Sequence, residues 1–363
     1  MNNEWKARVL AFYLPQFHPI PENDCWWGKG FTEWTNVGKA RRFYPGHDQP
    51  RVPADLGYYD LRVPETRMAQ AGLAREHGVE GFVYWHYWFG NGKRLLERPF
   101  NEVLASGRPD FPFALAWANE TWSGSFHGLK TGGTLIEQTY PGDGDHIAHF
   151  NAVLPAFRDS RYITCDGKPM FFVYKPLQLP DMAHFIGCWQ RLAKESGLPG
   201  ICFVAIGQAL FSEWACGRYY RQMKDAGFDY VNVVNVWEGS EYRRLAKLGL
   251  DFLHRRGVLP DIRPYSPKIF DSAIDAYEDV IPSVAPMWDH TPRSGRRGVV
   301  LHGSTPEKFG EAVSRMLGRI GTKPSGRRFL MVKSWNEWAE GNYLEPDLRW
   351  GHGYLEALRR ALS

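Results

Sequence analysis

The chain has 363 residues, with 44 basic against 40 acidic side chains and a formal net charge of +4. This near balance excludes the strongly basic surface that nucleic-acid binding requires, and no apolar run is long enough to span a membrane. The five cysteines are odd in number and widely spaced, which argues against a disulfide framework and against a structural zinc site.

Eight short and nearly continuous apolar runs predict β-strands that are buried on both faces. They are Arg8–Tyr13, Val79–Trp85, Pro112–Trp117, Pro169–Tyr174, Gly200–Ile206, Phe228–Val234, Ser283–Trp288 and Arg328–Ser334. Amphipathic stretches with Asp, Pro and Gly at their ends predict helices between the strands. These are Pro64–His77, Lys93–Ser106, His146–Arg158, Asp181–Ser196, Trp214–Ala226, Pro267–Val280, Thr305–Gly318 and Gly353–Leu362.

Eight strands alternating with eight helices predict an α/β fold, a single (β/α)8 TIM barrel over residues 1–363. A doubly wound sheet would also alternate, but no glycine-rich phosphate turn follows the first strand. Long connections follow strands one, three and six, at Leu14–Pro53, Ala118–Asp145 and Asn235–Ser266. These connections leave the carboxyl ends of the strands, where barrel enzymes carry their active sites, so we expect the loops to be functional.

Polar and aromatic residues follow most of the predicted strands, and aromatic residues make up 15% of the chain. The strand ends carry Gln16, His18, His86, Tyr87, Trp88, Asn119, Glu120, Trp122, Lys175, Trp288, Asp289, His290, Asn336, Glu337 and Glu340. In a barrel these residues meet at one end, and flat aromatic faces beside carboxylates are typical of a carbohydrate site. We predict substrate contacts for Tyr13, Gln16, His18, Trp34, His86, Trp88, Trp117, Asn119, Glu120, Lys175, Trp288, Trp335 and Asn336.

The segment 334–341 (Ser-Trp-Asn-Glu-Trp-Ala-Glu-Gly) offers two ways to pair carboxylates for glycosidic chemistry. Glu120 and Glu337 follow different strands and could form the acid and nucleophile of an ordinary glycosidase. Alternatively Glu337 and Glu340 act together, one as base and one as acid, if their surroundings separate their pKa values. The spacing alone leaves both pairings open.

Five ordered strings resemble one protein family over nearly the whole chain. They are residues 12–19 (Phe-Tyr-Leu-Pro-Gln-Phe-His-Pro), 26–34 (Trp-Trp-Gly-Lys-Gly-Phe-Thr-Glu-Trp), 85–89 (Trp-His-Tyr-Trp-Phe), 116–120 (Ala-Trp-Ala-Asn-Glu) and 335–341 (Trp-Asn-Glu-Trp-Ala-Glu-Gly). The chain resembles the WbsX family, which occurs with bacterial surface-polysaccharide genes. That family is similar to glycoside hydrolase family 99, the endo-α-mannosidases.

The resemblance implies a retaining hydrolase in which Glu337 and Glu340 are catalytic. Glu337 would remove the proton of the sugar 2-hydroxyl, whose oxygen attacks C1 to form a 1,2-anhydro sugar. Glu340 would protonate the leaving oxygen and then activate the water that opens this intermediate. Axial 2-hydroxyls suit this geometry, which implies an α-manno- or α-rhamno-configured linkage in a surface polysaccharide or O-antigen-type glycan. Glu120 would then bind substrate.

Two other functions remain open at this stage. A glycosyltransferase of lipopolysaccharide or O-antigen biosynthesis would use a sugar nucleotide, and Asp143-x-Asp145 is its one candidate metal motif, although a helix start explains those residues more simply. A non-catalytic saccharide-binding barrel would not need paired glutamates. We therefore expect a glycan substrate, no cofactor, no metal and no nucleic-acid partner. Because no signal-like apolar segment precedes the first strand, we expect a cytoplasmic protein.

Overall fold

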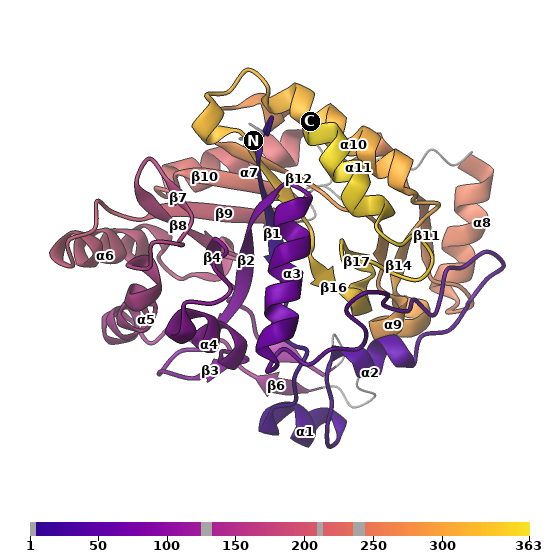
Figure 1. Cartoon of the computed structure of the whole chain (residues 1–363), viewed down its shortest axis with the longest axis horizontal. Coiled ribbons are helices and arrows are strands. Elements are labelled where there is room, and N and C mark those ends of the chain that lie inside the picture. Colours follow the sequence, from indigo (N-terminus) through magenta and orange to yellow (C-terminus); the bar gives the residue numbers. More distant parts are fainter. Residues whose placement is uncertain (1–4, 125–132, 209–212, 235–243) are drawn as a thin grey trace.

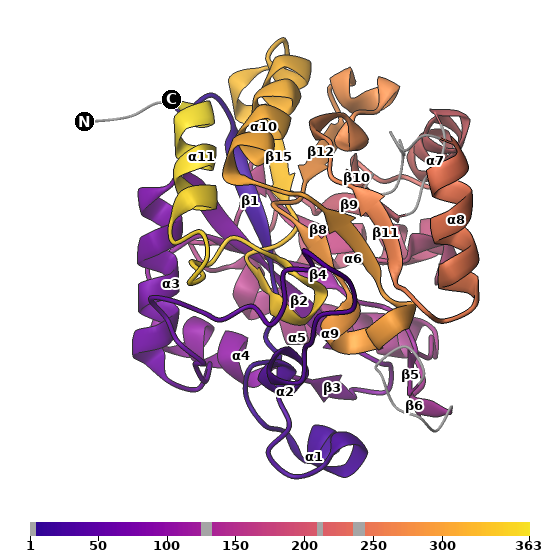
Figure 2. The ribbon, with the colours of Figure 1, turned by 90° about the vertical axis from the view of Figure 1, so that its right-hand side faces the viewer.

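Eight parallel strands close into a barrel, which confirms the predicted (β/α)8 fold (Figures 1 and 2). The structure is a computed structural model that describes residues 5–124, 133–208, 213–234 and 244–363. The barrel strands are β1 (Arg8–Tyr13), β2 (Val79–Trp88), β4 (Phe113–Trp117), β8 (Lys168–Val173), β9 (Cys202–Gln208), β10 (Tyr230–Val234), β12 (Val280–Val284) and β15 (Phe329–Val332). Each pairs in parallel with its neighbour, and β15 pairs with β1 to close the ring.

Helices cover the barrel from outside, and most of them lie within a few residues of the prediction. They are α3 (Pro64–Glu76), α4 (Arg98–Ser106), α5 (Asp143–Phe157), α6 (Met182–Glu195), α7 (Glu213–Asp225), α10 (Pro306–Ile320) and α11 (Gly353–Leu362). The helix predicted from Lys93 begins later, because β3 (Arg94–Leu95) first pairs with the end of β2. Three short elements lie in the connections: β7 (Thr164–Cys165), which pairs with β8, η1 (Pro176–Gln178) and η5 (Ser325–Arg327).

The prediction of a helix over Pro267–Val280 is wrong. Two separate 3-10 turns, η2 (Pro267–Phe270) and η3 (Ala273–Ala276), occupy this segment, and its last residue already begins β12. Ser266 caps the first turn, and Ser272 caps the second through a reciprocal pair of hydrogen bonds with Asp275. These serines satisfy the backbone at each turn locally, so the backbone does not continue as one helix. The seventh strand, predicted as Ser283–Trp288, correspondingly begins and ends earlier.

The long connections contain structure of their own at the carboxyl end of the barrel. The loop after β1 holds α1 (Pro21–Trp27) and α2 (Glu33–Gly38), and the loop after β4 holds β5 (Trp122–Ser123) and β6 (Thr134–Ile136). The loop after β10 holds α8 (Arg244–Arg255) and β11 (Asp261–Pro264). Figure 1 shows α1, α2 and α9 at the end of the molecule opposite the chain termini.

Two further connections were not predicted to be long. The one after β12 carries β13 (Trp288–Asp289), α9 (Thr291–Ser294), η4 (Gly295–Arg297) and β14 (Val299–His302), and β14 joins β11 and β13 in a small sheet. The one after β15 carries β16 (Asn336–Glu337), η6 (Trp338–Glu340) and β17 (Asn342–Tyr343). No helix among the described residues is both long and apolar enough to cross a bilayer.

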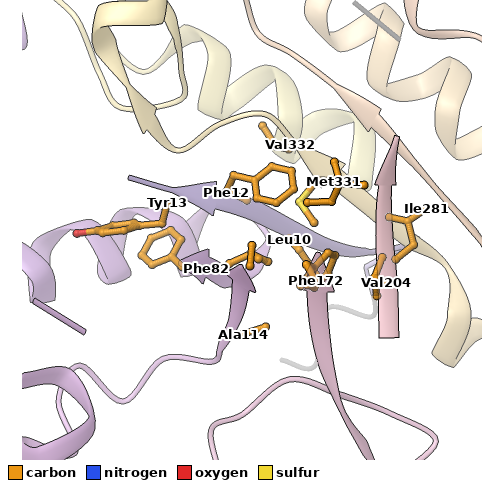
Figure 3. Packing of buried hydrophobic residues seen from close by; sticks show 14 of the residues in the cluster. Leu10, Phe12, Tyr13, Phe82, Ala114, Phe172, Val204, Ile281, Met331 and Val332 are labelled. Carbon is orange, nitrogen blue, oxygen red and sulfur yellow. The ribbon is translucent and has the colours of Figure 1, made fainter. Parts of the chain in front are cut away.

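Alternate residues of each barrel strand point inward and outward, as the strand period of two requires. Inside the barrel, Leu10, Phe12, Phe172, Val204, Ile281 and Met331 gather from different strands (Figure 3). Tyr13, one residue after Phe12, points instead toward the helices, and its hydroxyl donates a hydrogen bond of 2.7 Å to Gln70 on α3. This alternation decides which residues at the strand ends can reach the centre of the barrel mouth.

A buried carboxylate, Asp289, links the first long loop to the connection that follows the seventh barrel strand, β12. It accepts hydrogen bonds of 2.8 Å from both His47 and Gln49, and one of 2.6 Å from the hydroxyl of Thr291. Burial alone would raise the pKa of Asp289, but the bond from His47 and the charge of Arg51 hold it below its ordinary value. The carboxylate is therefore ionised and fully satisfied by its neighbours.

We expect Asp289→Ala to lower the free energy of unfolding by about 3 kcal/mol, because it leaves several buried donors without an acceptor. Asp60→Ala is the matched control, since Asp60 pairs with Arg62 at the surface, and it should cost less than about 1 kcal/mol. Denaturant unfolding of both variants measures the difference. Equal losses in the two variants would contradict this role of Asp289.

Candidate active site

Glu337 and Glu340 lie in a tight turn that follows the eighth barrel strand. β16 and β17 form a short antiparallel pair, and η6 connects them, so the chain folds back and brings both glutamates to the same place. Gly341 ends this turn with φ of +60°, and a Cβ there would lie 2.8 Å from the Cβ of Asp289. Only glycine fits this close approach in a left-handed conformation. Both glutamates are buried, with exposed fractions of 4% and 9%.

The carboxylate of Glu337 faces the interior of the barrel mouth. Its Oε1 accepts a hydrogen bond of 2.9 Å from the indole of Trp85 and one of 3.3 Å from the hydroxyl of Ser334. Trp85 is held flat against Phe12, with ring centroids 4.7 Å apart. A rigid aromatic contact therefore fixes the donor that orients this glutamate.

The carboxylate of Glu340 is held by a guanidinium. Arg293, from the short helix α9, lies with Nη1 2.5 Å from Glu340 Oε1 and with Nη2 2.9 Å from Glu33 on α2. His290 Nε2 lies 3.7 Å from the same glutamate oxygen, and Asn342 donates to the other oxygen at 3.3 Å. Glu33, Arg293 and Glu340 thus form a chain of ion pairs. Their side chains are no more than 12% exposed, so solvent screens their charges only weakly.

These surroundings move the two carboxyl groups in opposite directions. Burial and the negative charge of Glu340 raise the pKa of Glu337. Burial would also raise the pKa of Glu340, but the cationic charges of Arg293 and Lys333 overcome it and hold that pKa well below its ordinary value. When the pair holds one proton, that proton lies on Glu337, so the surroundings separate the two pKa values as the Glu337–Glu340 pairing requires.

Glu120, the other candidate for the pair, has a different partner. Lys175 Nζ lies 2.5 Å from Glu120 Oε2, and the two side chains are 34% and 18% exposed. Asn119 connects the loops that carry them, because its amide bonds the backbone N–H and C=O of Lys175. Glu120 and Lys175 thus form an ion pair at the ends of the third and fourth barrel strands.

Several predicted substrate contacts lie instead between the strands and the outer helices. Tyr13 bonds to α3, His86 lies 2.8 Å from His149 on α5, and Trp88 donates to Asp145 on the same helix. Trp117 packs against Phe185 on α6, and Trp335 packs against Phe82 in the same layer. The first four occupy outward positions of the alternation and contact helix side chains, and Trp335 is fully buried, so the proposed site does not include these five residues.

Most of the remaining predicted residues are buried or bonded within the protein, and Trp288 lies closest to the catalytic pair. Asn336 bonds to the backbone of Leu14, and the indole of Trp34 bonds to the backbone of Tyr59, so both anchor the first loop. His18 is buried, with one ring nitrogen bonded to Pro15, and Gln16 is also buried. Trp288 lies at the site, next to Lys333.

Sequence reasoning missed the residues that surround the pair most closely, namely Glu33, Trp85, Arg293 and Lys333, and did not select Tyr87 or His290 although both follow predicted strands. For β2 the reason is the alternation: Trp85 and Tyr87 point inward, whereas the prediction took His86 and Trp88. Burial of both faces removes the polar-apolar contrast that would have revealed the inward positions. Glu33 and Arg293 are 260 residues apart, and no sequence spacing signals their contact.

Comparison with known proteins assigns the chain to a family. A profile of the family described as "Glycosyltransferase WbsX" matches residues 9–358. The chain belongs to the WbsX family. This confirms the predicted resemblance.

Relatives of this WbsX chain include the "Uncharacterized protein WxcX" of two strains of Xanthomonas campestris pathovar campestris. Each is 38% identical over 364 residues, which cover 98% of this chain and 50% of the relative. The chain thus spans about half the length of these curated relatives.

Solved structures share the fold of this WbsX protein at low sequence identity. One is described as a "Glycoside hydrolase-like protein", with a TM-score of 0.62, 13% identity, and coverage of 98% of this chain and 94% of the other. A GH99 endo-α-mannosidase from Bacteroides thetaiotaomicron gives a TM-score of 0.59 at 14% identity, covering 98% and 95%. At this level of identity the likeness establishes the barrel fold.

Removing the guanidinium should make stability depend on pH. In Arg293→Met the pKa of Glu340 rises above its unfolded value, so the folded variant holds an extra proton and loses stability as pH increases. The wild type keeps Glu340 ionised in both states and shows no such slope from this group. We expect a loss on the order of 3 kcal/mol at pH 8 and a smaller loss at pH 5, measured by denaturant unfolding.

Arg191→Met provides the control, because Arg191 and Glu195 form an exposed pair one helical turn apart. Its loss should stay below about 1 kcal/mol and should not depend on pH. A pH-independent loss in Arg293→Met would show that Arg293 does not control the charge of Glu340.

Proposed function

We propose that this chain is a retaining glycoside hydrolase that cleaves an α-manno- or α-rhamno-configured linkage of a bacterial surface polysaccharide or O-antigen-type glycan. The observation that carries this proposal is the buried pair Glu337 and Glu340, whose pKa values are driven apart by their surroundings. Paired carboxyl groups that share one proton are suited to acid–base work at a glycosidic bond. The barrel fold and membership of the WbsX family support the same reading.

The proposed reaction has two steps. In the first, Glu337 takes the proton of the sugar 2-hydroxyl, O2 bonds to C1, the bond from C1 to the leaving oxygen breaks, and Glu340 protonates that oxygen. In the second, Glu340 takes a proton from water, the water oxygen bonds to C1, the bond from C1 to O2 breaks, and Glu337 returns its proton to O2. Two displacements on C1 give net retention of configuration.

The charges of the ligand-free site correspond to the second step. Glu340 is ionised beside Arg293 and ready to accept a proton, while Glu337 holds the proton that O2 receives. For the first step the proton has to lie on Glu340 instead. Transfer between these neighbouring groups, together with a weaker hold by Arg293, would prepare the site when substrate enters.

A transferase reaction is the second candidate, and the family description as a glycosyltransferase favours it. The same two steps form a new glycosidic bond if a sugar hydroxyl replaces water. The alternative of a sugar-nucleotide transferase has less support, because Asp143 pairs with His184 and Asp145 accepts a hydrogen bond from Trp88 at the start of α5. Calorimetry with sugar nucleotides and Mn²⁺ tests it directly, and tight binding would favour it.

Substitution of either glutamate should slow cleavage strongly. We expect Glu337→Gln and Glu340→Gln each to lower kcat by about 10²- to 10⁴-fold, because each removes a group that moves a proton in the transition state. Reducing ends released from a panel of bacterial α-mannans, rhamnans and polysaccharides that contain uronic acids provide the measurement. The control is Glu307→Gln on the outer helix α10, which should retain activity. Wild-type rates in either site variant would reject the assignment, and longer glycans in place of reducing ends would indicate transfer.

The pH profile should follow the shared proton. The pKa of Glu337 is raised to about 7 by burial and by Glu340, so kcat/KM should fall as pH rises through about 7 and the pair loses its proton. On the acid side activity should persist well below pH 4, since the pKa of Glu340 is lowered. In Arg293→Met the acid limb should move to higher pH. An unchanged acid limb in this variant would contradict the arrangement.

A further inference from the structure

Lys333 brings a second cation to the catalytic pair. It directly follows β15, the strand that leads into the segment with both glutamates. Its ammonium lies 5.2 Å from the ring centroid of Trp288 and 5.8 Å from that of Trp85, the same indole that donates to Glu337. The residue is 7% exposed. Two aromatic faces therefore hold a nearly buried charge beside the glutamates.

The other cations of this site already have carboxylate partners. Arg293 is bound by Glu33 and Glu340 at contact distance, and Lys175 is bound by Glu120. By contrast, the ammonium of Lys333 makes neither a hydrogen bond nor a contact ion pair with any residue in the described part of the chain. An ammonium has three donors, and one that is nearly withdrawn from water gains by binding an acceptor. The arrangement is suited to an acceptor that arrives with the substrate.

We propose that Lys333 binds a carboxylate on the sugar unit that lies at Glu337 and Glu340, so that the natural substrate contains a uronic-acid-type residue at the cleaved linkage. This inference rests on the proposed function, because it places that sugar at the catalytic pair. A single ammonium matches a singly charged carboxylate. A doubly charged phosphate monoester would leave one negative charge uncompensated next to ionised Glu340. The indole faces of Trp85 and Trp288 position the ammonium.

The test compares two probes that differ only at C6, which is a carboxylate in methyl α-D-mannopyranosiduronic acid and a hydroxymethyl group in methyl α-D-mannopyranoside. Their binding to the purified full chain is followed by saturation-transfer NMR. We expect the wild type to bind the acid about tenfold more tightly than the neutral glycoside, which is the scale of one charge-assisted hydrogen bond. Lys333→Met should lose this preference while its affinity for the neutral glycoside, which reports a folded site, stays unchanged. Lys194→Met, at an exposed position on α6, is the matched control for loss of one positive charge.

Each outcome decides the inference. Equal binding of the two probes by the wild type, failure of both to bind, or a preference that survives in Lys333→Met would overturn it. If Lys333→Met binds neither probe, Lys333→Arg has to retain the preference for the acid, and its loss there would also overturn the inference.

The hydrolase proposal is judged separately, by the rates of the Glu337→Gln and Glu340→Gln variants. A charge preference that depends on Lys333 without any glycan cleavage would leave the binding inference standing and reject the hydrolase. Cleavage that requires both glutamates but shows no preference for acidic sugars would support the hydrolase and reject the binding inference.

Discussion

Arg293 joins three connections that the chain keeps far apart. It belongs to α9 after the seventh barrel strand, and its guanidinium contacts Glu33 from the first long loop and Glu340 from the turn after the eighth strand. Because this guanidinium stabilises the ionised form of Glu340, the neighbouring Glu337 meets a fixed negative charge and keeps its proton. One buried ion-pair chain thus fixes the loops and also makes the two carboxyl groups chemically unequal. Asp289 also holds the first long loop against the connection after β12, through hydrogen bonds from His47 and Gln49.

The barrel itself could be predicted from the sequence because its signal is local. A strand buried on both faces is a short apolar run, and capping residues mark where each helix begins or ends, so β1 and α11 were predicted at their observed bounds. The prediction failed at Pro267–Val280, where each serine cap closes a separate turn. The composition of that segment is compatible with a helix, and only the positions of its caps distinguish the two outcomes.

The sequence predicts only those active-site residues whose chemically informative side chains lie close together along the chain. Glu337 and Glu340 carry their own signal, since two carboxylates and two tryptophans follow a strand within one short segment. Trp85 carries no such signal, because an apolar strand does not reveal which of its residues point into the barrel. An error of one residue in this choice selects His86 instead of Trp85. The partners that set the charge of the pair, Glu33, Arg293 and Lys333, come from three different connections, and their meeting is a property of the closed barrel.

The charge of Lys333 connects substrate binding to the direction of proton transfer. In the ligand-free site its positive charge adds to that of Arg293 and lowers the pKa of Glu340, which keeps the proton on Glu337. A carboxylate that pairs with Lys333 would cancel that contribution, so the pKa of Glu340 would rise toward the value that a general acid needs. Release of the acidic sugar would restore the original charges. An acidic substrate would therefore create, by binding, the protonation state that cleavage of its own linkage requires, whereas a neutral glycan would leave Glu340 ionised and would react more slowly even if it bound equally well.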